Sequence, residues 1–309
     1  MPDSSGDFSV LIARLIADKA QLETRLAQAI SAIEATGMAI ADAQMMDTDG
    51  DVLEIAVTHD DAMQLKQCLL AQFSPCDLLV TRDVPVVPQL FISDMDSTMI
   101  GQECIDELAD FAGLKERISA ITERAMLGEL DFESALRERV GLLQGLDESA
   151  ISRCLEERIE PMPGARILVG TLKAKGCRTV LVTGGFHHFA DPVASWLGFD
   201  RVVGNHLAVE HGKLTGALAG PITDSSVKEQ VLRDESGKLG VGTISMATGD
   251  GANDIPMLQA ADYGIAYHAK PKAQAAANGA ISLGDLTSVL RLLDIPREEW
   301  SESAGFTGG

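Results

Sequence analysis

The chain has 309 residues, 46 of them acidic and 25 basic, and its formal net charge at pH 7 is −21. This charge argues against nucleic acid or an anionic membrane surface as the main partner. The five cysteines are scattered without a Cys-x-x-Cys pair, which excludes a disulfide framework and indicates a reducing compartment. The N-terminus lacks a signal-peptide core, and apolar runs stay below membrane-spanning length. We therefore expect an acidic, soluble protein of the cytoplasm.

The first 86 residues predict a small α+β domain. Strands are expected at 8–15, 38–46, 52–57 and 76–80, and helices at 18–35 and 61–73. The order βαββαβ is typical of an antiparallel sheet with helices on one face. This order resembles that of an ACT domain, a regulatory module that often binds amino acids. Element order leaves two roles open, binding of an amino-acid effector and dimerisation of the chain.

Pro85 and Pro88 mark a stiff linker to a second domain at 87–295. This domain opens with a buried strand at 90–92, and a helical insertion at about 103–160 would cap the ligand-binding edge of its sheet. Helices are then expected at 165–175, 189–197 and 226–235, strands at 179–183 and 243–247, and a hairpin within 201–224. Strands separated by helices imply a doubly wound, Rossmann-like parallel sheet. The tail at 296–309 is expected to be flexible.

The sequence Asp94-Met-Asp96 directly follows the first strand of the second domain. At the carboxyl end of a parallel strand, side chains project into the crevice where ligands bind. Two carboxylates crowded there repel each other unless a cation joins them. Taken alone, the pair favours a solvated turn. Its meaning depends on the rest of the chain.

Polar residues at three further strand or helix ends complete one chemical set. They are Thr183-Gly184-Gly185, Lys228, and Gly249-Asp250 with Asn253-Asp254. Together they fit the hydrolysis of a phosphate monoester through an aspartyl-phosphate. In this interpretation Asp94 attacks phosphorus, and Asp96 exchanges protons with the leaving group and with water.

The same set predicts a magnesium site, because Mg²⁺ prefers oxygen ligands. Asp94, Asp250 and the main-chain carbonyl of Asp96 are the candidate ligands. Asp254 is expected to orient Asp250 or bound waters without binding the ion itself.

Four residues are candidates for binding the phosphate group. The Thr183 hydroxyl and the Gly184 N–H would donate to its oxygens at a strand-to-helix turn. Lys228 would neutralise the charge that develops on it. Asn253 suits support of the loop or a polar contact to the phosphate.

These residues form a pattern that resembles the haloacid dehalogenase superfamily of phosphotransferases, and within it the phosphoserine phosphatases. Narrower marks of the latter are Glu103, Ala125-Met126, Phe132-Glu-Ser-Ala-Leu-Arg-Glu-Arg139, Pro163-Gly164-Ala165, Val182-Thr183-Gly184-Gly185-Phe186 and Gly264-Ile-Ala-Tyr-His-Ala-Lys-Pro271. The resemblance spans about residues 89–290.

The resemblance implies a Mg²⁺-dependent hydrolysis of O-phospho-L-serine, the last step of serine biosynthesis. Glu103 would then pair with the ammonium group of the substrate, and Arg139 with its carboxylate. Met126 and Phe132 would form the apolar wall of the cap. Thr183 stands where the family usually has serine, and it keeps the hydroxyl but adds a methyl group.

Two other classes of function use some of these features. A phosphatase or phosphotransferase for another small phosphomonoester would share the aspartyl-phosphate chemistry and differ at Glu103 and Arg139. A non-catalytic amino-acid sensor would use the N-terminal domain alone. It would have no reason to keep Asp94, Asp96, Lys228 and Asp250 together, which favours the enzyme.

Overall fold

The N-terminal part of the computed structural model, which describes residues 10–46, 50–126 and 129–302, is an antiparallel sheet with two helices. The strands are β1 (Val10–Ile16), β2 (Ala39–Met45), β3 (Leu53–Thr58) and β4 (Asp77–Thr81), and the helices are α1 (Lys19–Ala35) and α2 (Ala62–Phe73). Strand β1 lies between β3 and β4, and β2 pairs with β3. The predicted order βαββαβ is confirmed, although Phe8, the expected start of β1, lies outside the described residues.

Six parallel strands form the sheet of the second part, in the order β11-β10-β9-β5-β6-β7. Their bounds are β5 (Leu90–Ser93), β6 (Arg178–Phe186), β7 (Arg201–Glu210), β9 (Ser245–Gly249), β10 (Tyr263–Tyr267) and β11 (Gly279–Ile281). The predicted hairpin forms between β7 and the antiparallel β8 (Lys213–Ala219). The sheet is therefore mixed and not purely parallel, and its centre, β5, opens the domain as predicted.

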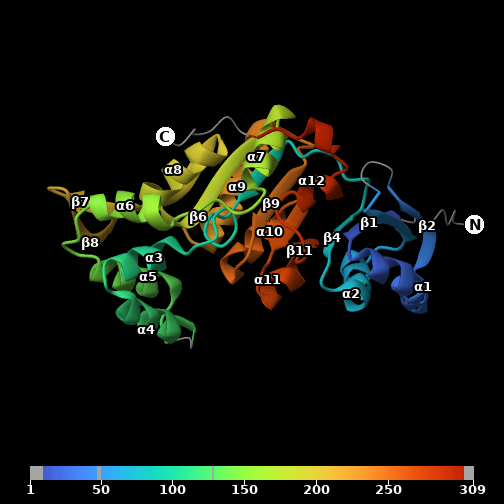
Figure 1. Ribbon diagram of the computed structural model, residues 1–309, viewed down its shortest axis with the longest axis horizontal. Coiled ribbons are helices and arrows are strands. Elements are labelled where there is room, and N and C mark those ends of the chain that lie inside the picture. Colours follow the sequence, from blue (N-terminus) through green and yellow to red (C-terminus); the bar gives the residue numbers. More distant parts are fainter. Residues whose placement is uncertain (1–9, 47–49, 127–128, 303–309) are drawn as a thin grey trace, which may run out of the picture.

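Helices cover both faces of this sheet (Figure 1). On one face lie α7 (Ala165–Ala174), α8 (His187–Leu197) and α12 (Ser288–Leu292), and on the other α9 (Ser225–Leu239), α10 (Ile255–Ala260) and α11 (Pro271–Ala276). The two faces have separate apolar cores, and successive residues of β5 serve them in turn. Phe91 packs with the first set of helices, whereas Leu90 and Ile92 pack with the second.

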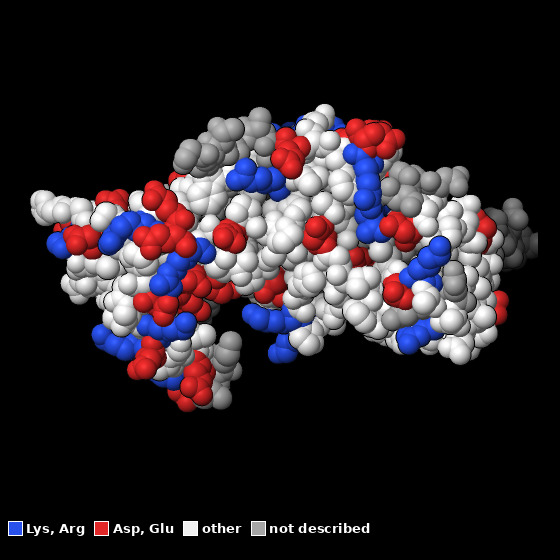
Figure 2. Space-filling view, in the orientation of Figure 1, with Lys and Arg blue, Asp and Glu red and all other residues white. Residues whose placement is uncertain are grey.

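The predicted helical insertion lies between β5 and α7. It consists of α3 (Cys104–Phe111), α4 (Lys115–Met126), α5 (Phe132–Leu142) and α6 (Ser149–Arg158). Figure 1 shows α3, α4 and α5 projecting from the sheet below the β7–β8 hairpin. Acidic and basic side chains crowd this projection on the face seen in Figure 2. Among the described residues, none of the helices combines the length and apolar character needed to cross a bilayer.

The two predicted domains share one sheet of 11 strands. Strand β4 pairs antiparallel with β11, with Leu79 opposite Gly279 and Leu78 opposite Ala280. The described part of the tail is also held, because the Ser301 N–H donates to Thr171 Oγ1 over 2.9 Å. Figure 1 shows the N-terminal part and the cap at opposite ends of the molecule.

Candidate active site

A cavity at the carboxyl ends of β5, β6 and β9, under the cap, brings most of the predicted site residues together. Of those residues, its walls include Asp94, Asp96, Glu103, Phe132, Arg139, Thr183, Gly184, Asp250 and Asn253. The first strand supplies the two aspartates, the cap supplies Glu103, Phe132 and Arg139, and β6 supplies Thr183 and Gly184. This convergence is what a parallel sheet imposes on residues that follow its strands.

Asp94 is fixed at the centre of the sheet. Its N–H donates to the Thr248 carbonyl oxygen of β9 over 3.0 Å, which extends the β5–β9 pairing by one residue. Its Oδ1 accepts from the Met95 N–H at 2.8 Å. The residue is 4% exposed. Its carboxylate is therefore held in one orientation at the floor of the cavity.

Two buried carboxylates contact one buried ammonium group, and a third, half-buried carboxylate lies beside them. Lys228 Nζ lies 2.7 Å from Asp94 Oδ1 and 2.7 Å from Asp254 Oδ1, and Lys228 is 1% exposed. One carboxylate oxygen each from Asp94, Asp250 and Asp254 lie within 4.8 Å of one another. With one cation for three anions the cluster keeps excess negative charge, so the donor set fits a divalent cation. Asp254, expected outside the ligand set, is part of this cluster.

The glycines at 249 and 251 let the chain pass close to Asp254. A Cβ atom on Gly249 would lie 2.4 Å from Cγ of Asp254, and the Gly251 N–H donates to Asp254 Oδ2 over 3.0 Å. A side chain at position 249 would push Asp254 away from Lys228.

The crowding shifts the proton affinities of these groups. Burial, and then the charge of Asp254, raises the pKa of Asp94 well above its ordinary value, against the opposing pull of Lys228. Burial followed by the nearby charge of Glu103 raises the pKa of Asp96 to about 7. Burial alone would lower the pKa of Lys228, but the charges of Asp94 and Asp254 outweigh it and raise that pKa. A pKa near neutrality suits a group that both gives and takes a proton.

The start of α3 positions Asp96 and Glu103. The Cys104 N–H donates to Asp96 Oδ1 over 3.1 Å, and Ser97 Oγ donates to Glu103 Oε1 over 2.8 Å. Ser97 adopts a left-handed backbone conformation with φ of 54°. Ser97 is not among the predicted site residues, because a serine in a loop carries no signal that would reveal this contact.

Thr183 is accommodated by the strand beside it. Its Oγ1 accepts from the Gly185 N–H at 2.8 Å, and the residue is 1% exposed. A Cβ atom on Gly204 of β7 would lie 3.1 Å from Cγ2 of Thr183. The added methyl group thus has room because residue 204 lacks a side chain.

Asn205 is a buried support for Gly184 that sequence reasoning missed. Its Nδ2 donates to the Gly184 carbonyl oxygen over 2.7 Å, and its Oδ1 accepts from the Thr223 N–H at 2.8 Å. Asn205 is 1% exposed and lies within β7. An asparagine inside a predicted strand is unusual, and that was the available signal.

The cap residues occupy the opposite wall. Arg139 of α5 is half-buried and its Nε donates to the Ala135 carbonyl oxygen over 3.3 Å. Burial lowers the pKa of Arg139, with Asp106 and Glu103 opposing. The Phe132 ring lies 3.5 Å from where a Cβ of Gly184 would be. Met126 ends α4, and its side chain is outside those that the structure describes.

Lys270 also lines the cavity, although it is not among the predicted site residues. Its N–H donates to the Asp250 carbonyl oxygen over 3.0 Å, and its Nζ lies 3.9 Å from Asp250 Oδ2. It belongs to the segment 264–271 noted above as a family mark.

The arrangement of a buried carboxylate beside a buried lysine, with an acidic cluster that could hold a cation under a helical cap, suits a phosphohydrolase. Comparison with known proteins identifies the class. The family model for haloacid dehalogenase-like hydrolases matches residues 91–259. A phosphoserine phosphatase of Albidiferax ferrireducens is 43% identical over 210 residues, covering 66% of this chain and 89% of that protein. Four other curated phosphoserine phosphatases are longer, and the chain spans between 52% and 65% of their length.

Solved structures give the same result. A probable phosphoserine phosphatase from Vibrio cholerae aligns with a TM-score of 0.70 and 32% identity, covering 95% of this chain and 88% of that one. A phosphoserine phosphatase holding a phospho-aspartyl intermediate analogue aligns with a TM-score of 0.61 and 36% identity, covering 66% of this chain and 98% of that one. The chain belongs to the haloacid dehalogenase-like hydrolases and, within them, to the phosphoserine phosphatase family.

Proposed function

We propose that the protein hydrolyses O-phospho-L-serine to L-serine and phosphate in a Mg²⁺-dependent reaction, the last step of serine biosynthesis in the cytoplasm. The observation that carries the proposal is one cavity in which Asp94 and Asp250 face Glu103 and Arg139 of the cap. The buried Lys228 and Asp254 lie directly behind Asp94. The residues around Asp94 serve phosphoryl transfer. Glu103 and Arg139 match the ammonium and carboxylate charges of an amino acid.

Two displacements at phosphorus account for the reaction. An Asp94 carboxylate oxygen attacks phosphorus, the bond from phosphorus to the serine oxygen breaks, and Asp96 gives its proton to that oxygen. Water then attacks the aspartyl-phosphate while Asp96 takes its proton back, which releases phosphate and restores Asp94. A pKa of Asp96 raised to about 7 suits both steps. A divalent cation held by Asp94, Asp250 and Asp254 or the Asp96 carbonyl would supply charge neutralisation for the phosphoryl oxygens.

Lys228, Thr183, Gly184 and Asn253 would bind the phosphoryl group. The Lys228 ammonium already contacts Asp94, so it lies beside the atom that becomes bonded to phosphorus. Glu103 is exposed at the cavity wall and would take the substrate ammonium, and Arg139 would take the carboxylate through its planar guanidinium. Met126 and Phe132 would complete the wall that excludes water.

For the rest of the chain we infer an ACT-like domain at 1–86, a catalytic domain at 87–295 and a terminal segment at 296–309. The element order supports the first inference. An amino-acid effector bound by this domain, and a homodimer formed through it, are the two roles that its resemblance suggests.

The test is release of phosphate from L-phosphoserine with Mg²⁺ and with EDTA, beside phosphothreonine, sugar phosphates and p-nitrophenyl phosphate. We expect metal-dependent turnover that prefers phosphoserine. Asp94→Asn, which keeps the shape of the side chain, should lower kcat by about 10⁴-fold or more with an unchanged circular dichroism spectrum. Preference for another substrate would overturn the cap assignments and leave the chemistry standing. No turnover on any substrate would favour the amino-acid sensor.

A further inference from the structure

The N-terminal part binds a segment of the second domain that borders the active site. This segment, residues 268–284, runs from the end of β10 through α11 and β11 to the loop before α12. Besides the pairing of β4 with β11, two buried charged side chains of the N-terminal part bind it, Lys66 and Asp77. Both side chains are 1% exposed or less. A charged group is rarely buried to this extent unless hydrogen bonds satisfy it.

Lys66 of α2 binds the carboxyl end of α11. Its Nζ donates to the carbonyl oxygen of Ala277 over 2.5 Å and also to that of Gln274. The last carbonyl groups of a helix lack partners within the helix and carry partial negative charge. The buried ammonium group of Lys66 donates hydrogen bonds to these carbonyl groups and also neutralises their partial negative charge.

Asp77 of β4 binds the loop after β11. Its Oδ1 accepts from the N–H groups of Ser282 at 2.9 Å and Leu283 at 2.8 Å, and its two oxygens share the Gly284 N–H. Its Oδ2 also accepts from Ser288 Oγ at 2.7 Å. Gly284 has no room for a side chain, since a Cβ there would lie 2.2 Å from Ser288 Oγ. The loop is thus closed tightly around one carboxylate.

From this loop, contacts lead to the cavity. The Gly284 carbonyl oxygen binds His268 Nε2 at 2.9 Å, and the His268 N–H donates to the Ile281 carbonyl oxygen over 2.8 Å. Two residues later stands Lys270, the first residue before α11, whose N–H binds the Asp250 carbonyl oxygen. The two ends of α11 are therefore held at different places, one by Lys66 and one beside Asp250.

We propose that Lys270 is a substrate-binding residue of the phosphatase, and that Lys66 and Asp77 of the N-terminal part position it. The proposal rests on the function proposed above. Lys270 is 67% exposed and lines a cavity whose other charged residues are four carboxylates and one cation, Arg139 of the cap. In a chain with a net charge of −21, an ammonium group at this cavity would attract a dianionic phosphate against the overall negative charge.

The first experiment tests Lys270. Lys270→Gln should raise KM for phosphoserine about 5-fold, leave kcat within about 2-fold, and flatten the fall of kcat/KM with ionic strength. Lys270→Arg should restore both KM and the salt dependence. An unchanged KM and salt dependence in Lys270→Gln would overturn the binding role.

The second experiment tests the positioning by the N-terminal part. Lys66→Met keeps the length of the side chain and removes the charge, so the chain should fold. Arg14→Met is the matched control, because Arg14 is 3% exposed in the same domain and also donates to a carbonyl of the second domain, that of Leu292. Leu292 ends α12, which contributes no residue to the described walls of the cavity.

We expect faster amide hydrogen exchange over 268–284 in Lys66→Met and Asp77→Asn, and not in Arg14→Met. KM should rise in the first two variants with kcat little changed, and Lys66→Met should add little when Lys270 is already Gln. Loosening of the segment without a rise in KM would reduce Lys66 and Asp77 to structural supports, against the proposal. Should the parent chain fail to turn over phosphoserine, the proposed function fails, and the exchange data still decide whether the N-terminal part holds the segment.

Discussion

The predicted catalytic residues lie at the ends of strands β5 and β9 and in the first turns of helix α9. The sequence predicts Asp94, Asp250 and Lys228 as site residues. Burying carboxylates after strands costs free energy unless a cation, such as a metal ion or a lysine, pairs with them. The inclusion of Asp254 in the cation cluster could not be predicted, since it depends on how far the Gly249 backbone lets it approach. Asn205 depends on a contact across two strands that spacing does not show.

Arg139 offers a prediction about substrate choice. Arg139→Ala should raise KM for phosphoserine by roughly 10- to 100-fold, the effect of losing one charged hydrogen-bonded partner. A substrate without the carboxylate, phosphoethanolamine, should lose far less. Steady-state kinetics on both substrates measure the difference.

Arg137→Ala is the control for this change. Arg137 lies on the same helix, is 54% exposed, pairs with Glu133 and is not among the residues that line the cavity. Arg137→Ala should leave KM unchanged for both phosphoserine and phosphoethanolamine. Equal losses on phosphoserine and phosphoethanolamine in Arg139→Ala would remove the basis for assigning the carboxylate to Arg139.

Helices and strands with a clear hydrophobic period were predicted within about two residues. Helix α2 begins at Ala62 and ends at Phe73, against an expected 61–73. The largest differences come from tertiary contacts. Strand β6 continues to Phe186, past the expected end at 183, because Phe186 also pairs with Asn205 of β7. Helix α9 runs four residues beyond its expected end, to Leu239, and Lys238 in its last turn binds Glu235.

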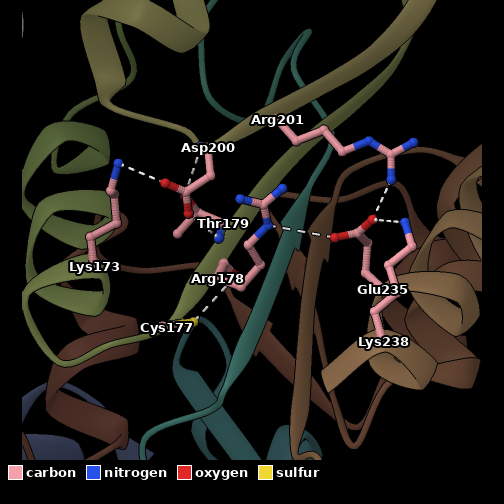
Figure 3. Close-up of polar contacts among 8 residues, drawn as sticks. All are labelled: Lys173, Cys177, Arg178, Thr179, Asp200, Arg201, Glu235 and Lys238. Carbon is pink, nitrogen blue, oxygen red and sulfur yellow. Dashed lines mark hydrogen bonds and ion pairs between the residues drawn. The ribbon is translucent and has the colours of Figure 1, made fainter. Parts of the chain in front are cut away.

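Glu235 joins α9 to the amino ends of β6 and β7 (Figure 3). Its carboxylate binds Lys238 at 2.7 Å, Arg178 at 3.5 Å and Arg201, and the residue is 4% exposed. Glu235→Gln should lower the free energy of unfolding by about 1–3 kcal/mol, because three cations lose their shared anion. The active site lies at the opposite ends of the strands, so kcat and KM should stay unchanged. Urea denaturation and steady-state kinetics measure both.

The pH dependence of this loss follows from the pKa of Glu235. Burial would raise that pKa, but the hydrogen bonds from Lys238 and Arg201 outweigh it and lower the value. A lowered carboxyl pKa gives stability that is present above the pKa of the unfolded chain and disappears as pH falls. The difference between parent and Glu235→Gln should therefore shrink in acid. Glu229→Gln, which loses an exposed pair with Arg233 on the same helix, should cost little at any pH.

The union of the two parts in one sheet could not be foreseen from element order. A phosphoserine phosphatase of known structure is covered over 98% of its length by 66% of this chain, so the family fold is complete in a shorter protein. In this chain β4 covers the edge of β11, which would otherwise present unpaired backbone groups. The linker prolines, Pro85 and Pro88, lie between β4 and β5. They give no sign that the sheets on either side join through β4 and β11.

The buried charge at this junction makes stability depend on pH. Burial lowers the pKa of Lys66 from 10.5 to about 8. Between these values the unfolded chain binds more protons than the folded chain, so the free energy of unfolding should rise with pH. From pH 7.5 to 9.5 the parent should gain roughly 2 kcal/mol relative to Lys66→Met, in which this titration is absent and all others remain. Urea denaturation of both proteins at the two pH values measures the gain. If the difference in free energy of unfolding between the two proteins stays constant with pH, burial does not lower the pKa of Lys66. The carbonyl groups of Gln274 and Ala277 would then compensate fully for the loss of water around the ammonium group.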